Sequence, residues 1–88
     1  MLAEPCLICG KPGPSEEAHW PLSRRYGTAT VPLCRQCHDA AHWAKQWAIE
    51  ALIRLAPGYW RREGTWEMHR EAYENWCSKR KYLEAVRA

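Results

Sequence analysis

Four of the five cysteines form two CxxC pairs, a spacing typical of zinc sites. The pairs are Cys6 with Cys9 and Cys34 with Cys37. Tetrahedral zinc binds soft ligands at about 2.3 Å, and two residues between cysteines allow one tight turn to supply two of them. We therefore predict one structural zinc ion on these four side chains, the alternative being buried or redox-active thiols. The 24 residues between the pairs leave room for an inserted hairpin.

Three histidines lie close to the cysteine pairs in the sequence. His38 and His42 stand four residues apart directly after Cys37, and on a helix this spacing places both side chains on one face, where they can bind one ion. The alternatives are that one of them completes the zinc shell or lies on the surface. His19 lies between the cysteine pairs, and a hairpin would carry it back over the start of that helix. Its alternative role is packing beside Trp20.

Short strands followed by helices are expected to position these side chains. Residues 17–20 and 30–33 are the most strand-like segments, and turn residues surround them. From Arg35 onward, alanine, leucine and tryptophan recur at three- and four-residue spacing, which predicts one long helix that ends at Pro57-Gly58. The fold class predicted is small α+β, a single domain with a core over residues 1–56 and a helical extension over residues 57–88 packed on it.

A second helix is predicted from about Thr65, a plausible N-cap, with Glu67 in its first turn. Its apolar stripe consists of Trp66, His69, Tyr73, Trp76, Cys77 and Leu83. Cys77 has no CxxC partner, and we interpret it as a buried core thiol rather than a nucleophile because it falls on this apolar stripe. His69 is interpreted as a helix-face residue, because no neighbour has ligand spacing.

Length and charge set limits on the class of protein. The chain has 88 residues and a net charge of +3, with basic clusters at Arg24-Arg25, Arg61-Arg62 and Lys79-Arg80-Lys81. Each cluster is consistent either with a contact to nucleic acid or with ordinary solvated surface. No secretory signal and no apolar run of about 18 residues stands in the sequence, so we expect a cytoplasmic protein without a membrane partner. In a reducing compartment, paired cysteines favour metal over disulfides.

The motif residues together resemble the HNH endonucleases, in particular the small zinc-knuckle members common in bacteriophages and other mobile elements. The shared signature is a CxxC, a histidine followed shortly by proline and basic residues, and then LCxxCHxxxH. Residues 6–42 carry it here, with His19, Pro21 and Arg24-Arg25 in the middle and Leu33 to His42 at its end.

The resemblance implies a zinc-stapled ββα-metal fold of treble-clef type and hydrolysis of DNA phosphodiester bonds in a bacterial or phage-infected cell. By this analogy His38 and His42 bind a catalytic divalent ion such as Mg²⁺ or Mn²⁺, separate from the structural zinc. His19 is the general base, and Arg24 and Arg25 contact flanking phosphates.

Two positions differ from the family pattern. Ala18 stands where an acidic or histidine ligand is usual, and the segment before Leu33 contains threonines in place of the asparagine. These differences favour an alternative: a noncatalytic, degenerate zinc module that binds nucleic acid or a protein partner. A phage accessory subunit or inhibitor is a further alternative that the small size permits.

Overall fold

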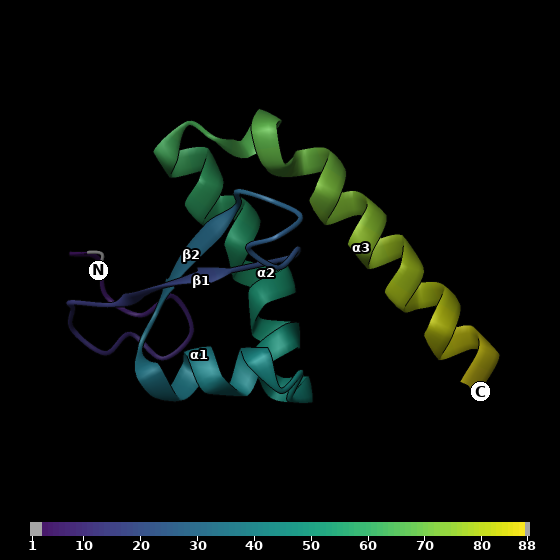
Figure 1. Ribbon diagram of the computed structural model, residues 1–88, viewed down its shortest axis with the longest axis horizontal. Coiled ribbons are helices and arrows are strands. Elements are labelled where there is room, and N and C mark those ends of the chain that lie inside the picture. Colours follow the sequence, from purple (N-terminus) through teal and green to yellow (C-terminus); the bar gives the residue numbers. More distant parts are fainter. Residues whose placement is uncertain (1–2, 88) are drawn as a thin grey trace.

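A two-stranded antiparallel sheet and three helices make up the part of the chain that the structure describes (Figure 1). This computed structural model describes residues 3–87, with side chains through residue 79. The elements follow in the order β1 (Glu16–His19), β2 (Thr30–Leu33), α1 (Arg35–His42), α2 (Gln46–Glu63) and α3 (Trp66–Arg87). The predicted α+β class is confirmed, and both strands lie within one residue of their predicted bounds.

The hairpin register brings the start of β1 next to the start of α1. Glu16 pairs with Leu33 and His19 with Thr30. Apolar side chains on both strands are fully or almost fully buried, among them Ala18, Val31 and Leu33. Because β2 is followed after one residue by α1, its end and the paired end of β1 lie beside the first turn of that helix.

An aromatic cluster joins the hairpin to the two longer helices. Trp60 stacks on Trp20 and on Trp66, with ring centroids 6.0 and 6.4 Å apart, and meets Tyr73 edge-on. Its indole Nε1–H donates a hydrogen bond to the carbonyl oxygen of Thr30 at 3.0 Å. The cluster gives the tryptophan-rich composition a structural role, because it supplies the contact between β2, α2 and α3.

The helix predicted to run unbroken from Arg35 is interrupted, so that prediction is wrong. α1 ends at His42, and Ala44 adopts a left-handed φ of 53°. The N–H groups of Ala44 and Lys45 donate to the carbonyls of Ala41 and Ala40, at 3.0 and 2.9 Å. These two bonds close the helix as a Schellman motif does, with alanine at the position that glycine usually occupies.

The predicted helix end at Pro57-Gly58 is also wrong, because α2 continues through Pro57 to Glu63. Proline removes the N–H that would bond to the carbonyl four residues earlier, which is that of Ile53. The phenol of Tyr73 on α3 donates to this carbonyl at 2.7 Å. A side chain from another helix thus supplies the missing donor, and the boundary predicted between residues 56 and 57 falls inside α2. Gly64, with φ 75°, ends the helix.

α3 begins at Trp66, as the sequence predicted, and packs on α2 through aromatic residues. Trp66, Tyr73 and Trp76 of the predicted stripe all contact the core, and Cys77 is half-buried. Leu83 lies outside the residues whose side chains are described, as do Arg80 and Lys81. No helix in the described part of the chain has the length and apolar character that crossing a membrane requires.

Candidate metal centre and histidine pocket

The four CxxC cysteines converge on one point, as their spacing predicted. Their sulfur atoms all lie within 4.8 Å of one another, and the Sγ atoms of Cys9 and Cys34 are 3.7 Å apart. Four sulfurs at about 2.3 Å from one tetrahedral zinc would lie about 3.8 Å apart. None of these cysteines forms a disulfide. The cluster is therefore a four-thiol site of the size and donor type that hold a structural metal such as zinc.

Backbone hydrogen bonds hold the first cysteine pair against the hairpin. The Gly10 N–H donates to the Cys6 carbonyl at 2.9 Å, and Gly10 has a φ of 77°, which glycine adopts without strain. The Leu7 N–H donates to the carbonyl of Pro32 at 2.8 Å, which ties this turn to β2. Gly10, directly after the first CxxC, thus closes the turn, and Leu7 within the CxxC docks the turn on β2, which leads to the second pair.

The second pair is fixed by the start of α1. Cys34 immediately precedes the helix, and Cys37 lies in its first turn. The His38 N–H donates to the Cys34 carbonyl at 2.8 Å, so the two sulfurs are presented by one helical turn. Metal binding at this cluster would therefore fix the helix end from which His38 and His42 project.

Burial and neighbouring dipoles shift the pKa values of Cys6 and Cys37 in opposite directions. Burial acts to raise the pKa of Cys6, but backbone N–H groups, chiefly those of Cys9 and Cys34, outweigh it and lower the pKa to about 6. Burial raises the pKa of Cys37 far above its ordinary value, and the adjacent thiols of Cys34 and Cys6 act in the same direction. A cation bound among these sulfur atoms would favour their thiolate forms, which are the forms that bind metal.

The three histidines singled out from the sequence line one pocket. Its volume is about 180 Å³, and its lining includes His19 at the end of β1, His38 and His42 on α1, and Arg24 on the loop between the strands. Arg25 is not part of this lining, and its guanidinium lies over the ring of Tyr26, 5.7 Å from the centroid. The hairpin does bring His19 back to the helix, as the sequence predicted.

These imidazoles do not form a closed ligand set. Within the described residues, the four cysteines are the only group of three or more His, Cys, Asp or Glu side chains close enough together to hold one ion. Ala18, at the position where the HNH endonucleases that the sequence resembles usually carry a ligand, is 2% exposed and packs in the core. A second metal on His38 and His42 therefore stays a prediction.

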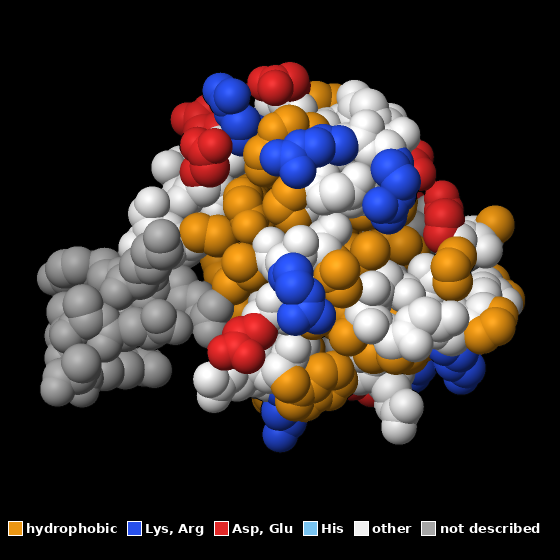
Figure 2. Space-filling model, turned by 180° about the vertical axis from the view of Figure 1, so that it is seen from behind, with side chains coloured by type: hydrophobic (Ala, Val, Ile, Leu, Met, Phe, Trp, Pro, Cys, Tyr) orange, Lys and Arg blue, Asp and Glu red, His pale blue; other side chains and the backbone are white. Residues whose placement is uncertain are grey.

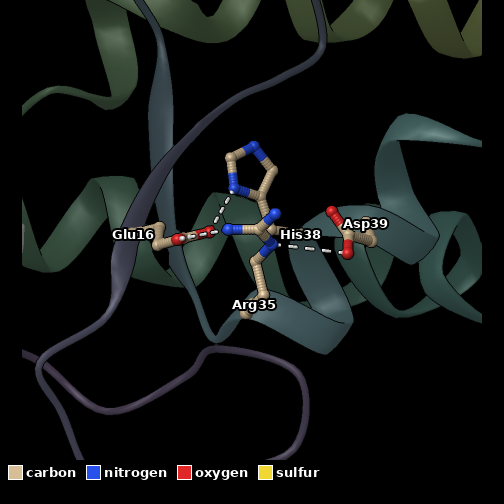
Figure 3. Close-up of polar contacts among 4 residues, drawn as sticks. All are labelled: Glu16, Arg35, His38 and Asp39. Atoms are coloured by element: carbon tan, nitrogen blue, oxygen red, sulfur yellow. Dashed lines mark hydrogen bonds and ion pairs between the residues drawn. The ribbon is translucent and has the colours of Figure 1, made fainter.

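An acidic hollow next to the histidine pocket contains a residue that the sequence did not single out. This hollow has a volume of about 550 Å³ and is lined by Glu16, Glu17, Arg35, His38, Asp39 and His42. The Nδ1 atom of His38 lies 2.9 Å from a carboxylate oxygen of Glu16 (Figure 3). Only the hairpin register could have indicated this contact, because 22 residues separate the partners in the sequence.

His69 and Cys77 lie apart from both pockets. His69 is buried against the ring of Trp60, with centroids 5.3 Å apart, and burial lowers the pKa of its imidazole. It therefore packs on the apolar face of α3, as predicted. Cys77 belongs to the same helix and lies outside the four-thiol cluster.

Basic side chains on the face opposite to that of Figure 1 are scattered. Figure 2 shows Lys and Arg there singly or in small groups among hydrophobic side chains. Among the described side chains visible there, they do not form a continuous stripe of the kind that follows a nucleic-acid backbone. Arg24 is set apart from these scattered residues by its place in the lining of the histidine pocket.

Comparisons with known protein families, with curated proteins and with solved structures find no match to this chain. The family resemblance therefore depends on the motif residues alone.

Proposed function

We propose that this chain is a zinc-stapled, metal-dependent nuclease of the HNH type that hydrolyses DNA phosphodiester bonds in the histidine pocket. The observation that carries the proposal is that His19 of β1 and both His38 and His42 of α1 line one pocket together with Arg24. The order of a hairpin followed by α1, with a four-thiol cluster at their junction, agrees with the ββα-metal arrangement that the sequence resemblance implies.

Each residue of the pocket has a role that suits its chemistry. His19 serves as the general base, because a neutral imidazole can accept a proton from an attacking water near neutral pH. Arg24 binds a phosphate oxygen through its guanidinium, and Arg25, which does not line the pocket, contributes through charge alone. His38 and His42 would hold the divalent ion. When bound, such an ion supplies a Lewis acid that neutralises charge on the phosphate and on the leaving oxygen.

A plasmid-nicking assay with Mg²⁺ or Mn²⁺ tests this proposal. We expect His19→Ala to lose about 10²- to 10⁴-fold in cleavage rate, the range usual for a general base, with unchanged zinc content and circular dichroism. If that variant cuts plasmid as fast as the parent, the assignment of the base is wrong.

The two neighbouring arginines form a matched pair for the same assay. Arg24 lines the pocket and Arg25 does not. Arg24→Ala is therefore expected to weaken cleavage more than Arg25→Ala, although both substitutions remove one positive charge. Equal losses would indicate that only net charge matters.

A second function is favoured by two specific observations. The histidines do not form a closed ligand set within the described residues, and Trp43 and Trp47 near the end of α1 are 72% and 55% exposed. Exposed tryptophans can stack on bases or anchor a protein partner. A noncatalytic zinc module would bind an oligonucleotide or a protein through them and cleave no substrate with any divalent ion. Loss of binding in Trp43→Ala, with no cleavage by the parent, would support this second function.

A further inference from the structure

Glu16 and His38 form a carboxylate–imidazole pair at the edge of the histidine pocket. The Glu16 Oε1 and His38 Nδ1 atoms are 2.9 Å apart, and Figure 3 shows the other ring nitrogen on the side away from Glu16. We propose that Glu16 is a positioning residue: it accepts the Nδ1–H of His38 and thereby leaves the Nε2 lone pair free to bind a divalent cation. The role of the cation depends on the function proposed above, but the pairing does not.

The fold brings the two residues together through the hairpin register. Glu16 is paired with Leu33, two residues before α1 begins at Arg35. His38 lies one turn into that helix, and its N–H bonds back to Cys34 of the thiol cluster. The carboxylate and the imidazole are thus presented by two backbone segments that the sheet and the cysteines hold in fixed relation.

The second oxygen of Glu16 has a partner of its own. Arg35 Nη1 lies 3.8 Å from Glu16 Oε2, and Arg35 Nε lies 3.5 Å from Asp39 Oδ2, as Figure 3 shows. The Arg35 side chain is 79% exposed, so these ion pairs add little stability. Arg35 lies beside the Oε2 atom of Glu16, and Oε1 is the oxygen that contacts His38.

The pairing decides which nitrogen of His38 can act as a ligand. In a neutral imidazole one nitrogen is a donor and the other an acceptor, and a carboxylate accepts but does not donate. The Nδ1–H form is therefore the one that Glu16 stabilises, and Nε2 keeps its lone pair. Outer carboxylates of this kind orient metal-binding histidines and raise their basicity, and their removal typically costs about 10- to 100-fold in metal affinity.

Nitrogen NMR of the His38 ring tests the pairing without any metal. At a pH where imidazoles are neutral, we expect the zinc-loaded parent to show a protonated Nδ1 and an unprotonated Nε2. Glu16→Ala should populate both tautomers, whereas Glu16→Gln retains an acceptor oxygen and should keep the parent form. Glu17→Ala is the matched control, because this neighbour is exposed, lines the same acidic hollow and carries the same charge.

Calorimetric titration with Mn²⁺ on the same zinc-loaded proteins tests the consequence. We expect Glu16→Ala to weaken Mn²⁺ binding by about 10-fold or more, and Glu17→Ala to change it by less than about 2-fold. A parent His38 protonated on Nε2, or a tautomer that is unchanged in Glu16→Ala, would overturn the inference. If the tautomer shifts as expected but the parent binds no Mn²⁺, the positioning role of Glu16 is supported and the metal role in the proposed function is overturned.

Discussion

At the scale of single residues, the hydrogen bond from Tyr73 to Ile53 explains how α2 tolerates a proline. A proline inside a helix removes one backbone donor and crowds the carbonyl four residues earlier. Here that carbonyl is turned toward α3 and accepts the Tyr73 hydroxyl at 2.7 Å. Burial raises the pKa of Tyr73 to about 12, and the adjacent Cys77 adds to this shift. The phenol therefore remains a donor throughout the neutral range.

This compensation predicts a coupling between Tyr73 and Pro57. Tyr73→Phe should lower the free energy of unfolding by about 1–2 kcal/mol, because the Ile53 carbonyl loses its partner. In a Pro57→Ala background the new backbone N–H can take that place, and the same substitution should cost at most about 0.5 kcal/mol. Urea denaturation of the zinc-loaded parent, Tyr73→Phe, Pro57→Ala and the double variant measures this coupling as a double-mutant cycle. Equal costs in both backgrounds would show that the phenol does not replace the missing donor.

At the scale of elements, the break between α1 and α2 determines where the helix that carries the histidines stops. α1 ends at His42, and the chain turns at Ala44 with a φ that L-residues adopt at a cost. Ala44 is exposed, so its side chain offers no packing that would require alanine at this position. The break is therefore a place where the backbone conformation can be tested separately from the core.

We expect Ala44→Gly to raise the free energy of unfolding by about 0.5–1 kcal/mol, because glycine adopts the left-handed region without strain. The gain is smaller than the full strain because glycine also adds freedom to the unfolded chain. Ala41→Gly, inside α1, should have the opposite sign and cost about 1 kcal/mol. Thermal or urea unfolding of both variants provides the measurement. Destabilisation by Ala44→Gly would mean that this residue does not hold the left-handed conformation in solution.

Local features of the sequence predicted the parts of the fold that depend on neighbours in the chain. The CxxC spacing located the thiol cluster, and the strand bounds and the start of α3 followed from turn and capping residues. The break at Ala44 could not be predicted, because neither glycine nor proline marks it. The continuation through Pro57 depends on Tyr73, which comes from another helix. Glu16 was missed for the same reason, since its contact with His38 exists only once the hairpin register is known.

At the scale of the whole molecule, one core connects the thiol cluster to the aromatic cluster. Cys6, Cys34 and Cys37 belong to the same buried cluster of side chains as Trp20 and Trp60. The hairpin lies between them, tied to the first cysteine turn through Leu7 and to α2 through the indole of Trp60. The two ends of the molecule therefore depend on each other, and a metal bound at the thiols would stabilise both.

Removal of the metal should accordingly unfold the chain as one unit. A structural zinc site contributes about 10–16 kcal/mol in small zinc domains, which is comparable to the whole stability of a domain of this size. We expect a chelator to abolish helical circular dichroism and to red-shift tryptophan fluorescence in a single coincident transition that added zinc reverses.

Cys6→Ser should weaken zinc binding and lower the midpoint of thermal unfolding by more than about 10 °C, since about 1 kcal/mol corresponds to several degrees in a chain this short. Cys77→Ser is the matched control, because Cys77 lies outside the thiol cluster and should leave zinc stoichiometry at one per chain. Two separate transitions, with the tryptophan signal surviving zinc removal, would show instead that the aromatic cluster folds without the metal site.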